Sequence, residues 1–160
     1  MVDPRKDKSY DKNEWRTPIK VFEAISEYFE IDFSLDPCAK PDNHLMLPKF
    51  YTKFDNGLRY EWMNEGVYIN PPFDNKETWI RKAISESKHH GSICVMLLPN
   101  FTDTDVFHSL IVPYSSIVFC EGRIRFIGAK GSPREGFILV KFPRDIKENK
   151  LNTLNLRGLS

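Results

Sequence analysis

Apolar residues along the chain change repeatedly from helical to strand-like spacing. One helical pattern begins with a hydroxyl and a proline and then places four apolar residues on one face: Thr17, Pro18, Ile19, Phe22, Ile25 and Phe29. Further helices are predicted between residues 75 and 90 and between 103 and 111. Short apolar runs predict strands at residues 31–35, 49–54, 66–69, 93–98 and 116–120. This alternation of helices and strands indicates an α/β domain.

The end of the chain predicts a different kind of pairing. The run 93–98 is apolar at every position, as in the central strand of a parallel sheet. Two later strands, 123–127 and 136–142, leave no room for a helix between them, so they are expected to pair as an antiparallel hairpin. The predicted fold is therefore a Rossmann-like, doubly wound sheet, mostly parallel, with an antiparallel terminal hairpin.

Length and composition limit the classes of protein that fit. A chain of 160 residues and 18.7 kDa suits one small domain, predicted over residues 14–144, after a flexible segment 1–13 and before a polar tail 145–160 of undefined order. No apolar run approaches the roughly 18 residues of a membrane helix, and the polar N-terminus does not resemble a secretory signal. The net charge of +1 neither requires nor excludes nucleic acid.

The three cysteines predict a reducing environment. Cys38, Cys94 and Cys120 are odd in number and widely spaced, and they form no CxxC pair. We therefore expect neither a disulfide framework nor a metal site, and the cytoplasm is the predicted location.

The segments that follow the predicted strands carry the candidate chemistry, because open α/β sheets bind ligands beyond the carboxyl ends of their strands. Asn70-Pro71-Pro72-Phe73 stands out among them. Two prolines fix two φ angles and remove two amide donors, Asn70 adds a side-chain acceptor, and Phe73 adds a stacking face. Such a rigid shelf suits an amino group on a flat ring, whose hydrogens can go to the Asn70 side-chain oxygen and the Pro71 carbonyl. The alternative is a simple strand-ending turn.

Two carboxylates and one indole are candidates for a second binding region. Asp36, followed by Pro37, Cys38 and Ala39, can bind the ammonium of an amino-acid-like ligand, or it can belong to a common Asp-Pro turn. Asp55 can accept hydrogen bonds from a ribose, or it can cap an Asp-Asn-Gly turn. Trp15, which lies before the first helix, can pack over a cofactor or can join that helix to the core.

In this order, the motifs resemble those of the small phage and prophage family of DNA N-6-adenine methyltransferases (Dam-like), over about residues 15–142. The matching segments are W-x-T-P at Trp15, Thr17 and Pro18; L-D-P-C-A at Leu35–Ala39; N-P-P-F at Asn70–Phe73; L-L-P at Leu97–Pro99; and G-R-I-x-F at Gly122–Phe126. The resemblance implies a class I methyltransferase domain that uses S-adenosyl-L-methionine. It places cofactor contacts at Trp15, Thr17, Pro18, Asp36, Pro37, Cys38 and Ala39, and catalysis at Asn70–Phe73.

The resemblance also implies a DNA partner and raises the question of how bases are read. Ala39-Lys40-Pro41 stands where many relatives have glycines that let the backbone approach the cofactor. With about 30 residues between the two main motifs, base reading is left to short loops or to a second subunit of a homodimer. A target adenine in a duplex must be flipped out beside Phe73. The cations expected to contact DNA are Lys76, Arg81, Arg123, Arg125, Lys130 and Arg134, although Arg123 can instead brace the floor of the site.

Adenine-N6 methylation of DNA, in a bacterial cell or a phage-infected host, is the leading hypothesis, and the family suggests that it marks phage DNA. The same kind of shelf also serves RNA adenines, cytosine N4 amines and protein glutamine amides. A second class of function is a non-catalytic, methyltransferase-like module that binds DNA.

Overall fold

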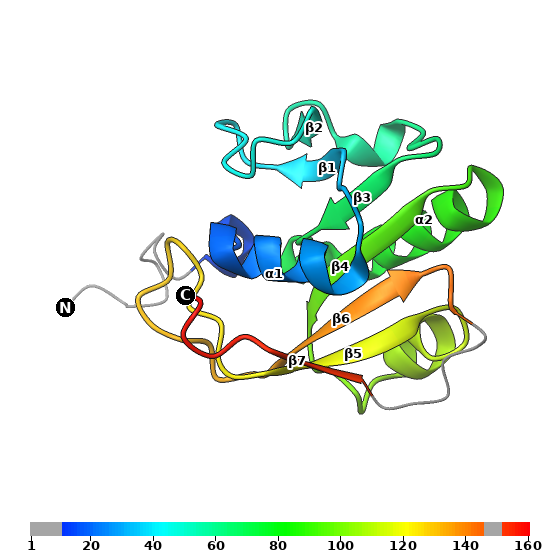
Figure 1. Cartoon of the computed structure of the whole chain (residues 1–160). Helices are drawn as coiled ribbons and strands as arrows, with labels where there is room; N and C mark the ends of the chain where they lie inside the picture. The colour runs from blue at the N-terminus through cyan, green and yellow to red at the C-terminus, as the bar shows by residue number, and fades with distance from the viewer. Residues whose placement is uncertain (1–10, 146–151) are drawn as a thin grey trace.

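The computed structural model describes residues 11–145 and 152–160 and contains one seven-stranded sheet (Figure 1). The strands are β1 (Leu35–Ala39), β2 (Lys49–Thr52), β3 (Gly66–Ile69), β4 (Ile93–Pro99), β5 (Ser116–Glu121), β6 (Phe137–Phe142) and β7 (Asn152–Asn155). The helices are α1 (Ile19–Phe29) and α2 (Lys76–His89), with short turns η3 (Lys12–Glu14), η4 (Gly57–Arg59) and η5 (Phe73–Asn75) and the π-helical η6 (Phe107–Ile111). No helix in this described part of the chain is long and apolar enough to cross a membrane.

The sheet is mixed, with the strand order β2-β1-β3-β4-β6-β5-β7. The pairs β1–β2, β1–β3, β3–β4 and β5–β7 are parallel, whereas β6 runs antiparallel to both β4 and β5. A mostly parallel α/β sheet with antiparallel pairing near its C-terminal end is therefore confirmed.

The prediction that β6 pairs with a strand at residues 123–127 is wrong. Residues 123–126 form no strand, and Ile127 makes only an isolated bridge with Arg16. β6 lies instead between β4 and β5, and its residues 137–140 are all buried. A strand that is apolar on both faces is most stable inside a sheet, where neighbours on both sides satisfy its backbone groups.

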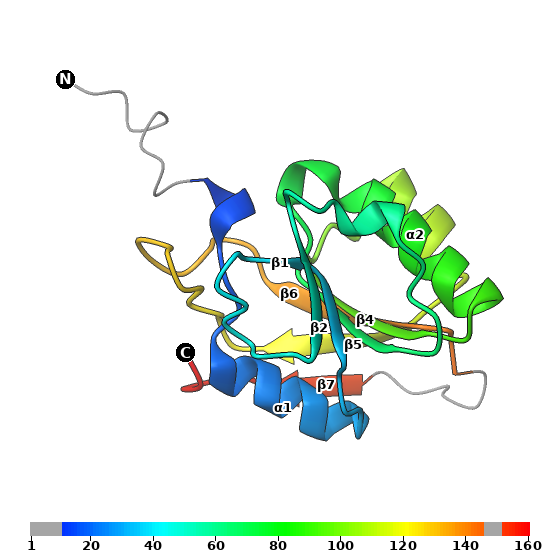
Figure 2. The same ribbon diagram turned by 90° about the horizontal axis from the view of Figure 1, so that it is seen from above.

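Helices cover both faces of the sheet, with α1 on one face and α2 on the other (Figure 2). The alternation of side chains in β4 shows the two cores: Cys94, Met96 and Leu98 pack with the α2 layer, whereas Val95 and Leu97 pack with the α1 layer. The prediction that β4 is a buried central strand is confirmed.

The first strand lies later in the sequence than its apolar pattern indicated. The sequence predicted a strand at 31–35 that stops at Asp36, but β1 covers Leu35–Ala39, so the D-P-C-A motif is part of the strand itself. Its pairing with β2 shifts register between Asp36 and Ala39. Pro37 lies in this interval and has no N–H for the ladder, which is a physical reason for the irregularity.

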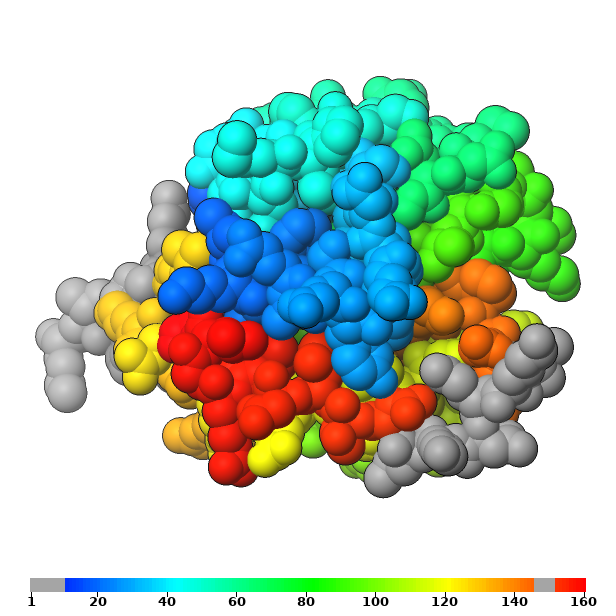
Figure 3. Space-filling view, in the orientation of Figure 1, coloured from blue at the N-terminus to red at the C-terminus, as the bar shows by residue number. Residues whose placement is uncertain are grey.

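The C-terminal stretch contributes to the fold. Asn152–Asn155 forms β7 at the edge of the sheet, parallel to β5, and Leu156 is buried in the α1-side core with Val21 and Ile25. In Figure 3 this stretch (red) lies against α1 (blue) on the visible face. The segment that was predicted as a polar tail of undefined order therefore contains a strand and a core residue.

Candidate active site

Asn70–Phe73 leaves the carboxyl end of β3 and leads into α2, as the sequence predicted. The side-chain Nδ2 of Asn70 donates to the backbone carbonyl of Trp15 at 3.2 Å. A carbonyl oxygen can only accept, so the amide nitrogen must face Trp15 and Oδ1 is turned away from it. The Cys38 thiol donates to the backbone carbonyl of Asn70 at 3.2 Å. The shelf is thus held from two sides, and its amide oxygen is oriented as an acceptor for another group.

An aromatic cluster surrounds this shelf. The ring of Phe73 meets Trp15 edge to face, with centroids 5.8 Å apart, and Trp15 stacks on Phe126 at 5.6 Å. Phe137 packs against both Phe73 and Phe126. The Lys12 ammonium lies 5.3 Å from the ring centroid of Phe73 and 5.8 Å from that of Trp15. The cluster joins the N-terminal turn, the shelf and the segment after β5 at one place.

Asp36 is a buried carboxylate at the same edge of the sheet. Only 5% of the residue is exposed, and its Oδ1 accepts the backbone N–H of Cys38 at 3.1 Å. Burial raises the pKa of Asp36 to about 7, while the hydrogen bonds from Cys38 and the charge of Lys40 act in the opposite direction. Because Cys38 contacts Asp36 through its backbone and Asn70 through its thiol, the two predicted centres are brought together.

The segment that leads into α1 beside these centres contains Trp15, Thr17 and Pro18. Thr17 was predicted to cap the helix, and this prediction is wrong. Pro18 is the N-cap residue, and no side-chain cap bond forms there. The Thr17 hydroxyl lies 2.7 Å from the hydroxyl of Tyr68 inside the protein, and the Thr17 carbonyl lies 3.0 Å from the ring Nε2 of His44. The hydroxyl is bonded across the core, so it is not available to the helix N–H groups.

The remaining predicted cofactor residues fall into two environments. Pro37 and Ala39 are buried in β1, and a Cβ on Gly57 would clash with the carbonyl oxygen of Pro37. Asp55 is exposed in the turn after β2, where its Oδ2 accepts from the N–H and the hydroxyl of Thr52, both at 2.8 Å. These bonds lower the pKa of Asp55. The described contacts of Asp55 are those of a turn carboxylate.

Two of the predicted DNA-contacting cations lie on the first turns of α2. Lys76 Nζ donates to the Phe73 carbonyl at 3.1 Å. Arg81 is exposed and forms an ion pair with Glu77 at 2.8 Å along the helix. Lys76 is thus bonded to η5, the turn before α2, and Arg81 to the residue one turn before it in α2.

The other predicted cations belong to the loop between β5 and β6, which folds back over the aromatic cluster. The Nη1 of Arg123 donates to the carbonyls of Pro133 at 2.6 Å and Arg134 at 2.5 Å, so this arginine braces the loop. Glu135 joins the loop to the N-terminal turn through an ion pair with Lys12 at 2.9 Å.

A hollow of about 570 Å³ opens beside the cluster, between the N-terminal turn and this loop. Its lining residues are Lys12, Trp15, Lys130, Gly131, Ser132, Pro133, Arg134 and Glu135. Arg125 lies outside this lining; its side chain is exposed and its backbone N–H donates to Ser160 Oγ at 2.9 Å. The structure therefore places Lys130 and Arg134 at the hollow and Arg125 on the nearby surface.

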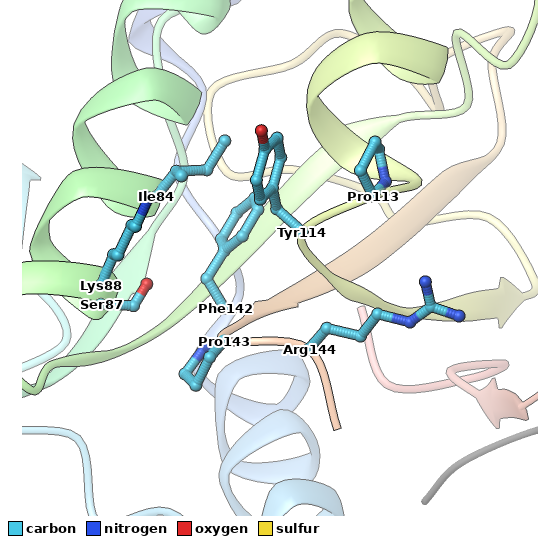
Figure 4. A pocket seen from close by; sticks show the side chains of 8 residues that line it. All are labelled: Ile84, Ser87, Lys88, Pro113, Tyr114, Phe142, Pro143 and Arg144. Atoms are coloured by element: carbon cyan, nitrogen blue, oxygen red, sulfur yellow. The ribbon is translucent and has the colours of Figure 1, made fainter. Parts of the chain in front are cut away.

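A second hollow of about 570 Å³ lies elsewhere, between the C-terminal half of α2 and the segments that follow η6 and β6 (Figure 4). Tyr114 and Phe142 contribute aromatic surface to it, and Lys88 and Arg144 contribute cations. Among the described residues that line it, none belongs to the predicted site.

Sequence reasoning missed three residues of this region. Tyr68 was treated only as a strand residue, and its hydrogen bond to Thr17, 51 residues away, depends on tertiary packing. Lys12 was assigned to the loose N-terminal segment, and its ring contacts depend on folding. Glu135 carries no sequence signal for its ion pair with Lys12, which is 123 residues away.

The sheet, with this site at the carboxyl ends of its parallel strands, is that of a class I S-adenosylmethionine-dependent methyltransferase. A solved structure from Listeria monocytogenes, provisionally assigned to that class, matches with a TM-score of 0.56 over 91% of this chain and 67% of that one, at 11% identity; this is a likeness of fold. The chain belongs to the DNA N-6-adenine-methyltransferase (Dam) family, whose model matches residues 5–136.

Two phage proteins are similar in sequence over much of the chain. The DNA N-6-adenine-methyltransferase of Haemophilus phage HP1 is 34% identical over 128 residues, which cover 79% of this chain and 73% of the phage protein. That of Escherichia phage T1 is 30% identical over 108 residues, which cover 67% of this chain and 44% of the phage protein. The chain is an adenine-specific DNA methyltransferase with S-adenosyl-L-methionine as its cofactor.

Proposed function

We propose that the Asn70–Phe73 shelf binds the N6 amino group of a flipped-out DNA adenine and directs its nitrogen at the methyl donor. The observation that carries this proposal is the orientation of the Asn70 amide. Its nitrogen is bonded to the Trp15 carbonyl, so its oxygen is the group that can accept an amine hydrogen. Pro71 adds a backbone carbonyl, and the next residue, Pro72, has no N–H group. Phe73 adds a ring face on which the base can stack.

The donors and acceptors at the carboxyl edge fit the amino-acid end of the cofactor. Asp36 is a buried carboxylate suited to an ammonium group. The indole Nε1 of Trp15 is buried and has no hydrogen-bond partner among the described residues, so it can serve a carboxylate. We assign these two contacts to Asp36 and Trp15. Pro37, Cys38 and Ala39 form the wall beside them, while Thr17 and Pro18 hold the Trp15 segment.

The chemistry of these residues is electrostatic. When bound, S-adenosylmethionine supplies an electrophilic methyl group. The adenine amine is a poor nucleophile because its lone pair is delocalised into the ring. Two acceptors, Asn70 Oδ1 and the Pro71 carbonyl, favour a pyramidal nitrogen and stabilise the positive charge that grows on it during attack. The nitrogen then loses one proton to water, so no strong base is required before the attack.

We propose that the DNA next to the target base lies along the hollow beside Trp15 and that the loop of residues 128–136 contacts it there. Lys130 and Arg134 line this hollow and carry the charge that phosphates require. The described residues form one sheet with its helices, so reading of neighbouring bases falls to such loops or to a second subunit. With DNA as the substrate, the proposed place of action is the cytoplasm of a bacterium or of a phage-infected host.

The test is methyl transfer from radiolabelled S-adenosylmethionine to DNA, RNA and protein, with Asn70→Ala beside the wild type. We expect labelling of DNA adenine, and a loss of about 100- to 1,000-fold in kcat for Asn70→Ala, with the cofactor Kd within about threefold. Asn75→Ala, which changes an exposed asparagine of η5, is the matched control and should keep its turnover. A near-normal rate for Asn70→Ala would remove this residue from catalysis.

A further inference from the structure

The orientation of the Asn70 amide depends on the position of one backbone carbonyl. That carbonyl belongs to Trp15, which is 55 residues away in sequence, and the bond length is 3.2 Å. If the Trp15 carbonyl moves, the amide loses the acceptor that fixes which of its two ends faces the substrate. The groups that hold the Trp15 segment therefore also control the catalytic acceptor.

The segment is held on two sides: the backbone of Arg16 pairs with Ile127 through hydrogen bonds of 3.1 and 3.0 Å, and Thr17 is bonded to β3. The Thr17 hydroxyl lies 2.7 Å from the Tyr68 hydroxyl. Thr17 is 1% exposed and Tyr68 is 0% exposed, so water does not compete for this bond. Burial raises the pKa of Tyr68 above its usual range, so the hydroxyl keeps its proton at working pH. The contact links β3 to the segment that leads into α1.

The same two segments are joined twice. Tyr68 belongs to β3 and Asn70 follows its last residue, and the side chains of both reach the segment of residues 15–17. Asn70 bonds to Trp15 and Tyr68 bonds to Thr17, which closes a ring of covalent and hydrogen bonds. The Arg16–Ile127 bridge holds the same segment from its other side, so the Tyr68 hydroxyl sets the position of the Trp15 carbonyl relative to β3.

We propose that Tyr68 is a positioning residue for methyl transfer, whose hydroxyl holds Thr17 so that the Trp15 carbonyl can orient the Asn70 amide. The inference rests on the proposed function of Asn70. Tyr68 does not touch the substrate in this account; it acts through the Trp15 segment. The aromatic part of Tyr68 has a separate role, because its ring packs against Phe22 and Phe33.

That separation makes Tyr68→Phe a sharp test, since it removes one oxygen and keeps the ring packing. We expect kcat for DNA adenine methylation to fall by about 10- to 100-fold, the range associated with small misplacements of reacting groups. The KM for DNA should stay within about threefold, because the loop of residues 128–136 is unchanged. The cofactor Kd, which involves the Trp15 indole, should change less than kcat. Thr17→Val removes the partner hydroxyl and should lower kcat similarly, whereas Thr17→Ser keeps that hydroxyl and should lose less than Thr17→Val.

The double variant Tyr68→Phe/Thr17→Val tests whether the two hydroxyls act as one unit. If they do, the double variant should lose little more than either single variant. Ser115→Ala is the matched control: Ser115 is buried, and its hydroxyl donates to the Ile111 carbonyl at 2.7 Å, away from the site. It should lower Tm slightly and leave kcat unchanged.

Three outcomes would overturn the proposal: a kcat for Tyr68→Phe within twofold of wild type, losses that multiply in the double variant, or an equal loss of kcat in Ser115→Ala. Thr17→Val supplies the same test if Tyr68→Phe does not fold. Failure of the proposed function is seen separately, as normal turnover by Asn70→Ala. An inactive Asn70→Ala beside a fully active Tyr68→Phe would refute only the positioning role.

Discussion

Cofactor affinity should fall steeply below pH 7 because of Asp36, and Asp36→Asn should abolish that dependence. Burial raises the pKa of this carboxylate from 3.8 to about 7, so the free protein holds a neutral acid at lower pH. An ammonium group binds the ionised form. Each pH unit below the pKa reduces the ionised fraction about tenfold, so at pH 5 the cofactor Kd should be about 100-fold higher than on the alkaline plateau.

Calorimetric titration with S-adenosylmethionine between pH 5 and 8.5 measures this effect. Below pH 7, log Kd of the wild type should fall by about one for each pH unit, and binding should release about one proton. Above pH 7, Kd should reach a plateau. Asp36→Asn should bind more weakly on the plateau and show no slope. The exposed turn carboxylate is the control: Asp55→Asn should keep the wild-type profile. A flat wild-type curve, or a slope retained in Asp36→Asn, would refute the reasoning.

The raised pKa of Asp36 should also make the stability of the ligand-free protein depend on pH. The folded state keeps the Asp36 proton to about pH 7, whereas the unfolded chain loses it near 3.8. The folded state therefore binds more protons in this window, and the free energy of unfolding should decrease as pH rises through it. About three pKa units correspond to at most about 4 kcal/mol. Chemical denaturation at pH 5 and pH 8 covers about two of these units, so it should show about 2.7 kcal/mol in wild type and the loss of this difference in Asp36→Asn.

Two further predictions concern DNA contact and stability. Arg134→Ala should weaken DNA binding and reduce the slope of log K against log salt by about one unit. Arg144→Ala, at the second hollow, is the control and should leave the slope unchanged. Equal slopes for wild type and both variants would show that Arg134 does not contact DNA. Glu86 is 1% exposed and forms an ion pair with Lys82 at 2.5 Å. Glu86→Ala should therefore lower the free energy of unfolding, measured by urea titration, by about 3 kcal/mol. Glu23→Ala, on the exposed face of α1, is the control and should change it little.

Many of the elements and much of the candidate chemistry could be predicted from local patterns in the sequence. Apolar spacing located α1, α2 and the central strand β4, because these signals are local and repeat every few residues. The two prolines after Asn70 predicted a rigid segment at the end of a strand, and the structure places that segment at the carboxyl end of β3. The ordered motifs predicted the family to which the chain belongs.

The pairing of strands and the contacts that hold the site depend on the folded structure. It placed β6 between β4 and β5, made Asp36 part of β1, and folded the β5–β6 loop against Lys12. It also turned the Asn70 amide toward the Trp15 carbonyl. Local periodicity describes which face of an element is apolar. The partner of a hydrogen bond or an ion pair is set by packing between segments 50 or more residues apart, which no local pattern encodes.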